Sequence, residues 1–171
     1  MKNIIFNKEN IKEEEINNIV KRAKIVLINS KDEILLTLCH KNYYLIGGHV
    51  ENNETDIETL KREILEETGI KLDINDIKPY FSIMHYKRNY PKENLISKFI
   101  ANYYYYKTDI LPDMTKTNLT EDEKKGKFQL NYINKNEILE IINNSLNTCT
   151  REGVVKDTIL ALEEFLNIEK K

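Results

Sequence analysis

Residues 47–70, GGHVENNETDIETLKREILEETGI, begin with two glycines and continue into a stretch dense in carboxylates. Thr55 followed by Glu58 is the pattern of a helix N-terminal capping box, and Gly69 is a typical C-terminal stop. Apolar residues recur at the spacing of one buried helix face, at Ile57, Leu60 and Ile64. This pattern predicts a helix over residues 55–68.

Three carboxylates of the predicted helix, Glu63, Glu66 and Glu67, fall on one side of it. At about 100° per residue they project within an arc of roughly 100°. Like charges three or four residues apart repel by roughly 0.2–0.5 kcal/mol per pair. Hard divalent cations such as Mg²⁺ take oxygen ligands from carboxylates, phosphates and water, and glycines let backbone carbonyls approach closely. The stretch therefore predicts half of a metal site, with a merely solvated helix face as the alternative.

The same stretch resembles the Nudix hydrolase signature, which runs Gly, five residues, Glu, seven residues, then Arg-Glu-aliphatic-any-Glu-Glu-any-Gly-aliphatic. Here Gly48 is followed after five residues by Glu54, and after seven more by REILEETGI at residues 62–70. Every specified position is filled. One departure is Ile46, where many members have Pro, and it affects loop rigidity rather than the ligands.

The resemblance implies an α+β fold, an α/β/α sandwich with a mixed β-sheet between helices. It also implies hydrolysis of a nucleoside diphosphate linked to another group, with Mg²⁺ or Mn²⁺ as cofactor. The family's metal ligands match the carboxylates of Glu63, Glu66 and Glu67 and the backbone carbonyl of Gly47. One of the last two carboxylates often also acts on the attacking water. Glu54 and Arg62 match a pair that orients the loop against the helix.

The rest of the chain alternates between β-rich and helical patterns. We expect strands at residues 23–30, 33–40, 43–48, 78–86, 96–107 and 127–133. We expect helices at residues 10–20, as part of a possible N-terminal helical extension over 1–20, at 134–142 with Asn134 as cap, and at 151–168. The order is no regular βαβ alternation, which disfavours a doubly wound fold. We expect one domain over residues 1–171.

Composition excludes several classes of function. The 171 residues carry a formal net charge of −2, without the basic surface that duplex nucleic acid requires. No apolar run approaches the ~20 residues that span a bilayer. The two cysteines stand far apart, which disfavours a disulfide framework or a zinc site and favours reduced thiols. We expect a cytoplasmic monomer or homodimer that binds a small-molecule nucleotide and no membrane.

Candidates for substrate contact lie outside the signature's ligands. His49 and Glu51 flank the glycine turn, and Tyr86 and Arg88 belong to the run HYKR at residues 85–88, which could reach a phosphate or base. Tyr104 belongs to the tyrosine run 103–106, which as a strand sends two rings to each face. The tyrosine run predicts one core pair and one surface pair, with base stacking by one ring as the alternative.

The polar segment 113–126 is predicted to be a loop. Members of the family often bring a water-activating carboxylate from such a loop, and Glu121, Asp122 and Glu123 are available here. We favour Glu121 or Glu123 for this role. The alternative is a segment that is only solvated.

The leading hypothesis is a metal-dependent pyrophosphohydrolase of a small nucleotide derivative. A second hypothesis is a nucleotide-sensing or protein-binding module on a Nudix scaffold. Such modules usually lack one of the ligand glutamates, and this sequence has all of them. An RNA 5′-end pyrophosphohydrolase is disfavoured by the near-neutral charge. An isomerase of isoprenoid diphosphates would need a reactive cysteine, and neither Cys39 nor Cys149 is obviously placed for that chemistry.

Overall fold

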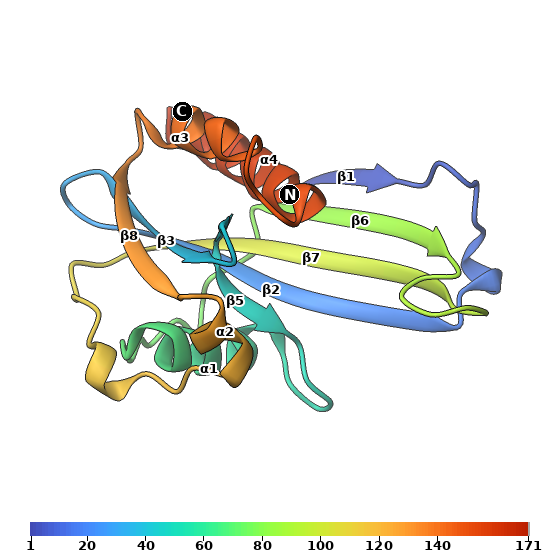
Figure 1. The fold of residues 1–171 in the computed structure, drawn as a ribbon, viewed down its shortest axis with the longest axis horizontal. Helices are drawn as coiled ribbons and strands as arrows, with labels where there is room; N and C mark the ends of the chain where they lie inside the picture. Colours follow the sequence, from blue (N-terminus) through green and yellow to red (C-terminus); the bar gives the residue numbers. More distant parts are fainter. Residues whose placement is uncertain (171) are drawn as a thin grey trace.

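A computed structural model describes residues 1–170, and in it a mixed eight-stranded sheet lies between helices (Figure 1). The strands are β1 (Lys2–Phe6), β2 (Asn18–Ile28), β3 (Glu33–Cys39), β4 (Asn42–Tyr44), β5 (Ile46–His49), β6 (Phe81–Arg88), β7 (Ile96–Lys107) and β8 (Gln129–Asn134). The helices are α1 (Asp56–Thr68), α2 (Glu121–Lys125), α3 (Ile138–Ser145) and α4 (Glu152–Glu169), with 3₁₀ turns at Glu13–Glu15 and Met114–Lys116.

The strand order is β1-β6-β7-β2-β3-β4, while β5 pairs with β2 and β8 pairs with β3. The pairs β1–β6 and β2–β7 are parallel, and the other pairs are antiparallel. Within residues 1–170, no helix combines the length and the apolar character that a membrane crossing requires.

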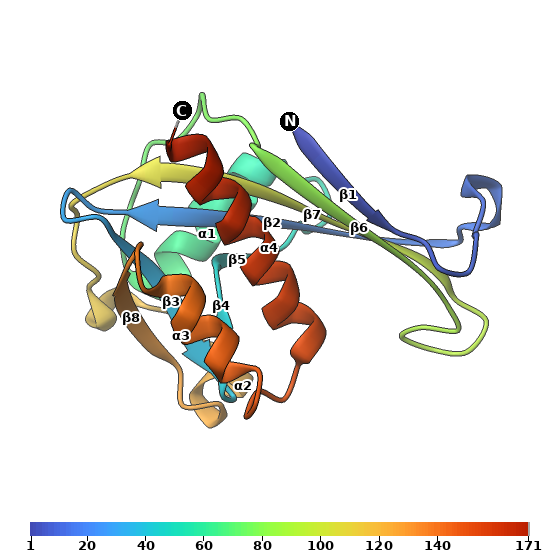
Figure 2. The same ribbon diagram turned by 90° about the horizontal axis from the view of Figure 1, so that it is seen from above.

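Helices cover both faces of the sheet, as the α/β/α sandwich predicts (Figure 2). Side chains of β2 alternate between two cores because successive residues of a strand point to opposite faces. Val26 and Ile28 join the core beneath α3 and α4, whereas Ile25 and Leu27 join the core beneath α1. The two cores hold α1 and α4 in fixed positions on opposite sides of the sheet.

Helix α1 confirms the prediction for residues 55–68. Thr55 accepts a hydrogen bond from the Glu58 backbone, and the Glu58 carboxylate accepts one from the Thr55 backbone. Gly69 ends the helix with a φ of 70°. Leu60 and Ile64 are fully buried. The strand over residues 96–107, the helix near 151–168 and the β2–β3 hairpin are confirmed as well.

Four local predictions are wrong. Residues 1–20 form no helical extension: β1 pairs with β6, and residues 10–20 form a 3₁₀ turn and the start of β2, where Asn18 already pairs with Ser97 of β7. The single strand predicted over residues 43–48 is two strands, β4 and β5, and β5 continues through the glycines to His49. Helix α3 begins only at Ile138, so Asn134 is not its cap. Segment 113–126 contains α2, whose capping box has the same form as that of α1.

The tyrosine run does not divide into a core face and a surface face. Tyr103 and Tyr104 are both buried, on opposite sides of β7, whereas Tyr105 is 39% exposed. Tyr105 nevertheless packs against Phe165 of α4, with ring centroids 5.5 Å apart. Because helices cover both faces of the sheet, burial changes along the strand rather than between its faces.

Candidate active site

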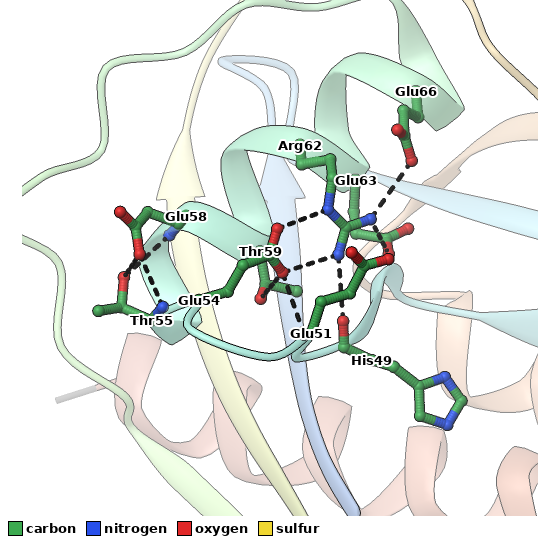
Figure 3. Close-up of polar contacts among 9 residues, drawn as sticks. All are labelled: His49, Glu51, Glu54, Thr55, Glu58, Thr59, Arg62, Glu63 and Glu66. Carbon is green, nitrogen blue, oxygen red and sulfur yellow. Dashed lines mark hydrogen bonds and ion pairs between the residues drawn. The ribbon is translucent and has the colours of Figure 1, made fainter.

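Arg62 of α1 forms hydrogen bonds with the loop that precedes the helix, at Glu54 and His49 (Figure 3). Its Nε and Nη2 donate to the two oxygens of Glu54 at 2.8 and 3.0 Å. Nη2 also donates to the His49 carbonyl at 3.1 Å, and Glu54 accepts a further bond from Thr59 Oγ1 at 2.8 Å. The hydrogen bonds from Arg62 lower the pKa of Glu54 to about 2. The structure thus brings the predicted orienting pair together.

The same guanidinium holds two of the three candidate metal ligands. Nη1 of Arg62 lies 2.7 Å from Glu63 Oε1 and 3.3 Å from Glu66 Oε2. Burial raises the pKa of Glu63, although Arg62 opposes this effect. The Glu63 carboxylate lies directly against Gly48, where a Cβ would displace it from its present position. Loop and helix therefore pack closely where the carboxylates gather.

The third carboxylate, Glu67, is 8% exposed. Its Oε2 is buried and has no hydrogen-bond partner among the residues that the structure describes. Burial raises the pKa of Glu67 to about 8, although the charge of Lys24 opposes this rise. Lys24 comes from β2, where the pairing with β5 places it opposite Gly47. Its Nζ donates to the carbonyls of Gly47 and Leu45, the latter at 3.2 Å.

The donors at this junction are all hard oxygens, the kind that Mg²⁺ and Mn²⁺ prefer. Within residues 1–170, no three His, Cys, Asp or Glu side chains yet converge as ligands of one ion would. Cationic side chains hold the donors instead, Arg62 at Glu63 and Glu66 and Lys24 at the Gly47 carbonyl. The free oxygen of Glu67 still lacks the partner that a cation would supply. The residues therefore fit a divalent cation.

A cavity of about 970 Å³ extends from these carboxylates along the sheet to the first turn of α4. Its near end is lined by Lys24, Gly47, Glu63, Glu66 and Glu67. Its far end is lined by His85, Lys87, Tyr90, Phe99 and Asp157. One continuous cavity thus connects the carboxylates of α1 and Gly47 to a wall that includes the rings of Tyr90 and Phe99.

The predicted substrate residues divide between this cavity and the opposite sheet face. His49 and Glu51 line the cavity. Tyr86 and Arg88 do not, because they alternate with the lining residues of β6, and they bond Glu13 and Glu15 respectively. Tyr104 lies on the α1 side, where its hydroxyl donates to Asp56 at 2.8 Å. The structure does not bring Tyr86, Arg88 or Tyr104 to the cavity.

The carboxylates of segment 113–126 also separate. Asp122 and Glu123 line the cavity, and the charge of Glu123 contributes to the raised pKa of Glu67. Glu121 points elsewhere and pairs with Lys124 at 2.8 Å. Of the two favoured loop carboxylates, only Glu123 is placed at the cavity.

The far end contains a pair formed by His85, from the run 85–88, and Asp157, which the sequence did not indicate. His85 Nε2 lies 3.0 and 2.9 Å from the two oxygens of Asp157 in α4, and the His85 ring stacks on Phe6 at 4.8 Å. The Tyr90 and Phe99 rings meet edge to face at 5.6 Å. In the sequence, Asp157 is only a polar position of the predicted amphipathic helix. Lys24 is only a lysine among the apolar residues of a predicted strand.

The model of the NUDIX domain family matches residues 19–142. This chain belongs to the Nudix family. The comparison with curated protein sequences finds no match.

Several solved structures are similar to this Nudix chain. The MutT protein of Methanosarcina mazei Go1 is 21% identical with a TM-score of 0.58, and the match covers 90% of this chain and 97% of that one. The E. coli ORF135 protein is 14% identical with a TM-score of 0.57, covering 93% and 96%. The C. elegans Ap4A hydrolase is 15% identical with a TM-score of 0.50, covering 88% and 98%. At these identities the likeness shows the fold alone.

Proposed function

We propose that this chain is a divalent-metal-dependent pyrophosphohydrolase that cleaves the diphosphate linkage of a nucleoside diphosphate derivative. The observation that carries the proposal is that Gly47, Glu63, Glu66 and Glu67 all line the same cavity. Membership of the Nudix family supports the same class of reaction. The names MutT and Ap4A hydrolase, which two structural neighbours bear, agree with it.

Glu63, Glu66, Glu67 and the Gly47 carbonyl would hold the ion. A bound Mg²⁺ or Mn²⁺ neutralises charge on phosphoryl oxygens and lowers the pKa of a bound water. The residues of the chain supply position and proton acceptance. Arg62 fixes the helix against the loop through Glu54. Glu66 or Glu67 accepts the proton of the attacking water, and Glu123 is the alternative acceptor from α2.

The substrate's nucleoside lies at the far end of the cavity in this proposal. Phe99 and Tyr90 offer ring faces and edges to a base, and Lys87, whose Nζ lies 4.6 Å from the Tyr90 ring centroid, adds positive charge. Small-molecule sites commonly enclose roughly 300–1,000 Å³. The volume of about 970 Å³ therefore accommodates a nucleoside diphosphate together with a second group.

The test is a substrate panel with Mg²⁺ and with Mn²⁺. It comprises nucleoside triphosphates, ADP-ribose, diadenosine polyphosphates, nucleotide sugars and capped RNA, with products resolved by chromatography. We expect hydrolysis of at least one small nucleotide, and a loss of about 10²-fold or more in Glu67→Gln because stabilisation of several kcal/mol disappears.

Glu163→Gln is the matched control, because Glu163 is exposed on α4 and does not line the cavity. Its turnover should equal that of the wild type. Full activity of Glu67→Gln, full activity in excess chelator, or no hydrolysis of any member of the panel would contradict the proposal.

A further inference from the structure

A lysine lies among the donors that the proposed function assigns to a metal ion. Lys24 is on the α4 side of β2, between Ala23 and Ile25, both of which are fully buried on the α1 side. The antiparallel register with β5 sets Lys24 opposite Gly47. A partly buried ammonium requires oxygen acceptors, and the backbone of β5 supplies them here.

The Lys24 ammonium donates to the Gly47 carbonyl and to the Leu45 carbonyl. The carboxylates of Glu67 and Glu63 act on its charge from α1. Arg62, the other cation of the junction, is engaged by Glu54, Glu63 and Glu66. Lys24 is therefore the cation that contacts the Gly47 carbonyl, and it lies close enough to Glu67 and Glu63 for their charges to act on it.

A divalent ion at the same oxygens would share its position with this ammonium. The Gly47 carbonyl already accepts a hydrogen bond from Lys24 Nζ, so the ammonium stands beside the oxygen that an ion would bind. Two cations in close contact also repel, and the repulsion is stronger at a partly buried site than in bulk water. The position of Lys24 without metal therefore opposes the binding of a divalent ion at the same carbonyl.

We propose that Lys24 is a positioning residue of the cation site: its ammonium holds the Gly47 carbonyl in place without metal, and a divalent ion binds by displacing it. The proposal rests on the proposed function for the identity of the ligands, Gly47 and Glu67. The unbonded Oε2 of Glu67 is the oxygen left available when the ion arrives. The lysine stem has four flexible carbons, which let the head group move without a change in the strand.

The test measures Mn²⁺ affinity of the nucleotide-free protein by calorimetry and by electron paramagnetic resonance. Lys24→Met keeps the length of the stem and removes the competing charge, so Mn²⁺ should bind about tenfold more tightly or better. Lys24→Gln should change the affinity in the same direction. Lys24→Arg keeps a cation there and should bind Mn²⁺ no better than the wild type.

Arg22→Met is the matched control. Arg22 lines the same cavity from the same face of β2, but it meets the His49 ring at 3.2 Å and is not bonded to Gly47. A general effect of net charge would tighten Mn²⁺ binding equally in Arg22→Met and Lys24→Met. That equality, or an unchanged or weaker affinity in Lys24→Met, would overturn the inference.

Melting temperatures give a second readout. In chelator Lys24→Met should melt below the wild type, and saturating Mn²⁺ should raise its melting temperature by more than it raises that of the wild type. If Lys24 only stabilised the fold, Lys24→Met would lower the melting temperature by the same amount in chelator and in saturating Mn²⁺. The affinity measurements contain no nucleotide, so they are independent of the substrate panel. If no substrate is hydrolysed but the Mn²⁺ affinities are as expected, only the proposed hydrolase activity is overturned. If a substrate is hydrolysed but Lys24→Met does not bind Mn²⁺ more tightly, only the role of Lys24 is overturned.

Discussion

At the scale of single residues, Arg62 joins the chemistry of the site to its stability. Its side chain is 25% exposed and bonds Glu54 with two parallel hydrogen bonds. Such charge-assisted pairs are strong, and losing one costs about 1–3 kcal/mol. We expect Arg62→Ala to lower both the melting temperature and turnover, whereas Glu66→Gln should lower turnover alone. Calorimetric melting and steady-state kinetics measure the two quantities.

Arg62→Lys is the informative control for this prediction. Lysine keeps the charge but cannot form the planar fork, so its melting temperature should lie between those of the wild type and Arg62→Ala. Equal melting temperatures for the wild type and Arg62→Ala would refute the orienting role.

Glu54 makes stability depend on pH in the acid range. Hydrogen bonds from Arg62 lower its pKa from 4.5 to about 2 in the folded state. A lowered carboxyl pKa stabilises the folded state above the unfolded value, and this contribution disappears as pH falls from 4.5 to about 2. Urea titrations from neutral pH down to about pH 2 should therefore show wild type more stable than Glu54→Gln near neutrality, with the difference vanishing at the acid end. A difference independent of pH would contradict the Arg62–Glu54 pairing in solution.

At the scale of elements, local signals were readable from the sequence and non-local ones were not. The ends of α1 depend on neighbouring residues, Thr55 with Glu58 and then Gly69. Helix α2 has an equivalent capping box but only five residues and no apolar stripe, so its composition resembled that of a loop.

Positions set by strand register were harder to predict. A shift of one residue exchanges the two faces of a strand. The sequence indicated the run 85–88 and favoured Tyr86 and Arg88 within it, whereas the structure places His85 and Lys87 at the cavity. The place of Lys24 depends on the pairing of β2 with β5. The partners His85 and Asp157 lie 72 residues apart in the chain, and no local pattern connects them.

Helix α2 provides a prediction at this scale. Glu123 lines the cavity while it also caps α2, accepting from the Thr120 backbone at 2.7 Å. Glutamine can serve in the same capping box, so Glu123→Gln removes the charge and keeps the helix. If Glu123 accepts the proton of the attacking water, turnover at saturating Mg²⁺ should fall about tenfold or more.

Glu121→Gln is the control within the same helix, because Glu121 pairs with Lys124 and does not line the cavity. Its turnover should stay close to that of the wild type. If Glu123→Gln also keeps wild-type turnover, the proton goes to Glu66 or Glu67, and α2 only covers the site.

At the scale of the whole molecule, the sandwich separates chemistry from recognition. α1 brings the carboxylates to one end of the cavity, and residues of β6, β7 and α4 line the other end. On β7, Phe99 lies four residues before Tyr103, the partner of Lys24 in the sheet. At about 3.3 Å per residue this is roughly 13 Å from the carboxylate end. A residue so placed can contribute to binding without taking part in the attack on phosphorus.

Phe99→Ala should therefore raise KM and leave turnover nearly unchanged. Stacking of a base on an aromatic ring contributes about 1–3 kcal/mol, which predicts an increase in KM of roughly tenfold, measured by initial rates on the best substrate of the panel. Tyr86→Phe is the control, because Tyr86 lies on the opposite face of the same sheet and its hydroxyl bonds Glu13 outside the cavity. Its kinetics should match the wild type. An unchanged KM in Phe99→Ala, or an increase of equal size in Tyr86→Phe, would contradict binding of the nucleoside at Phe99. The nucleoside would then be placed at the other end of the cavity, near His49 and Glu51.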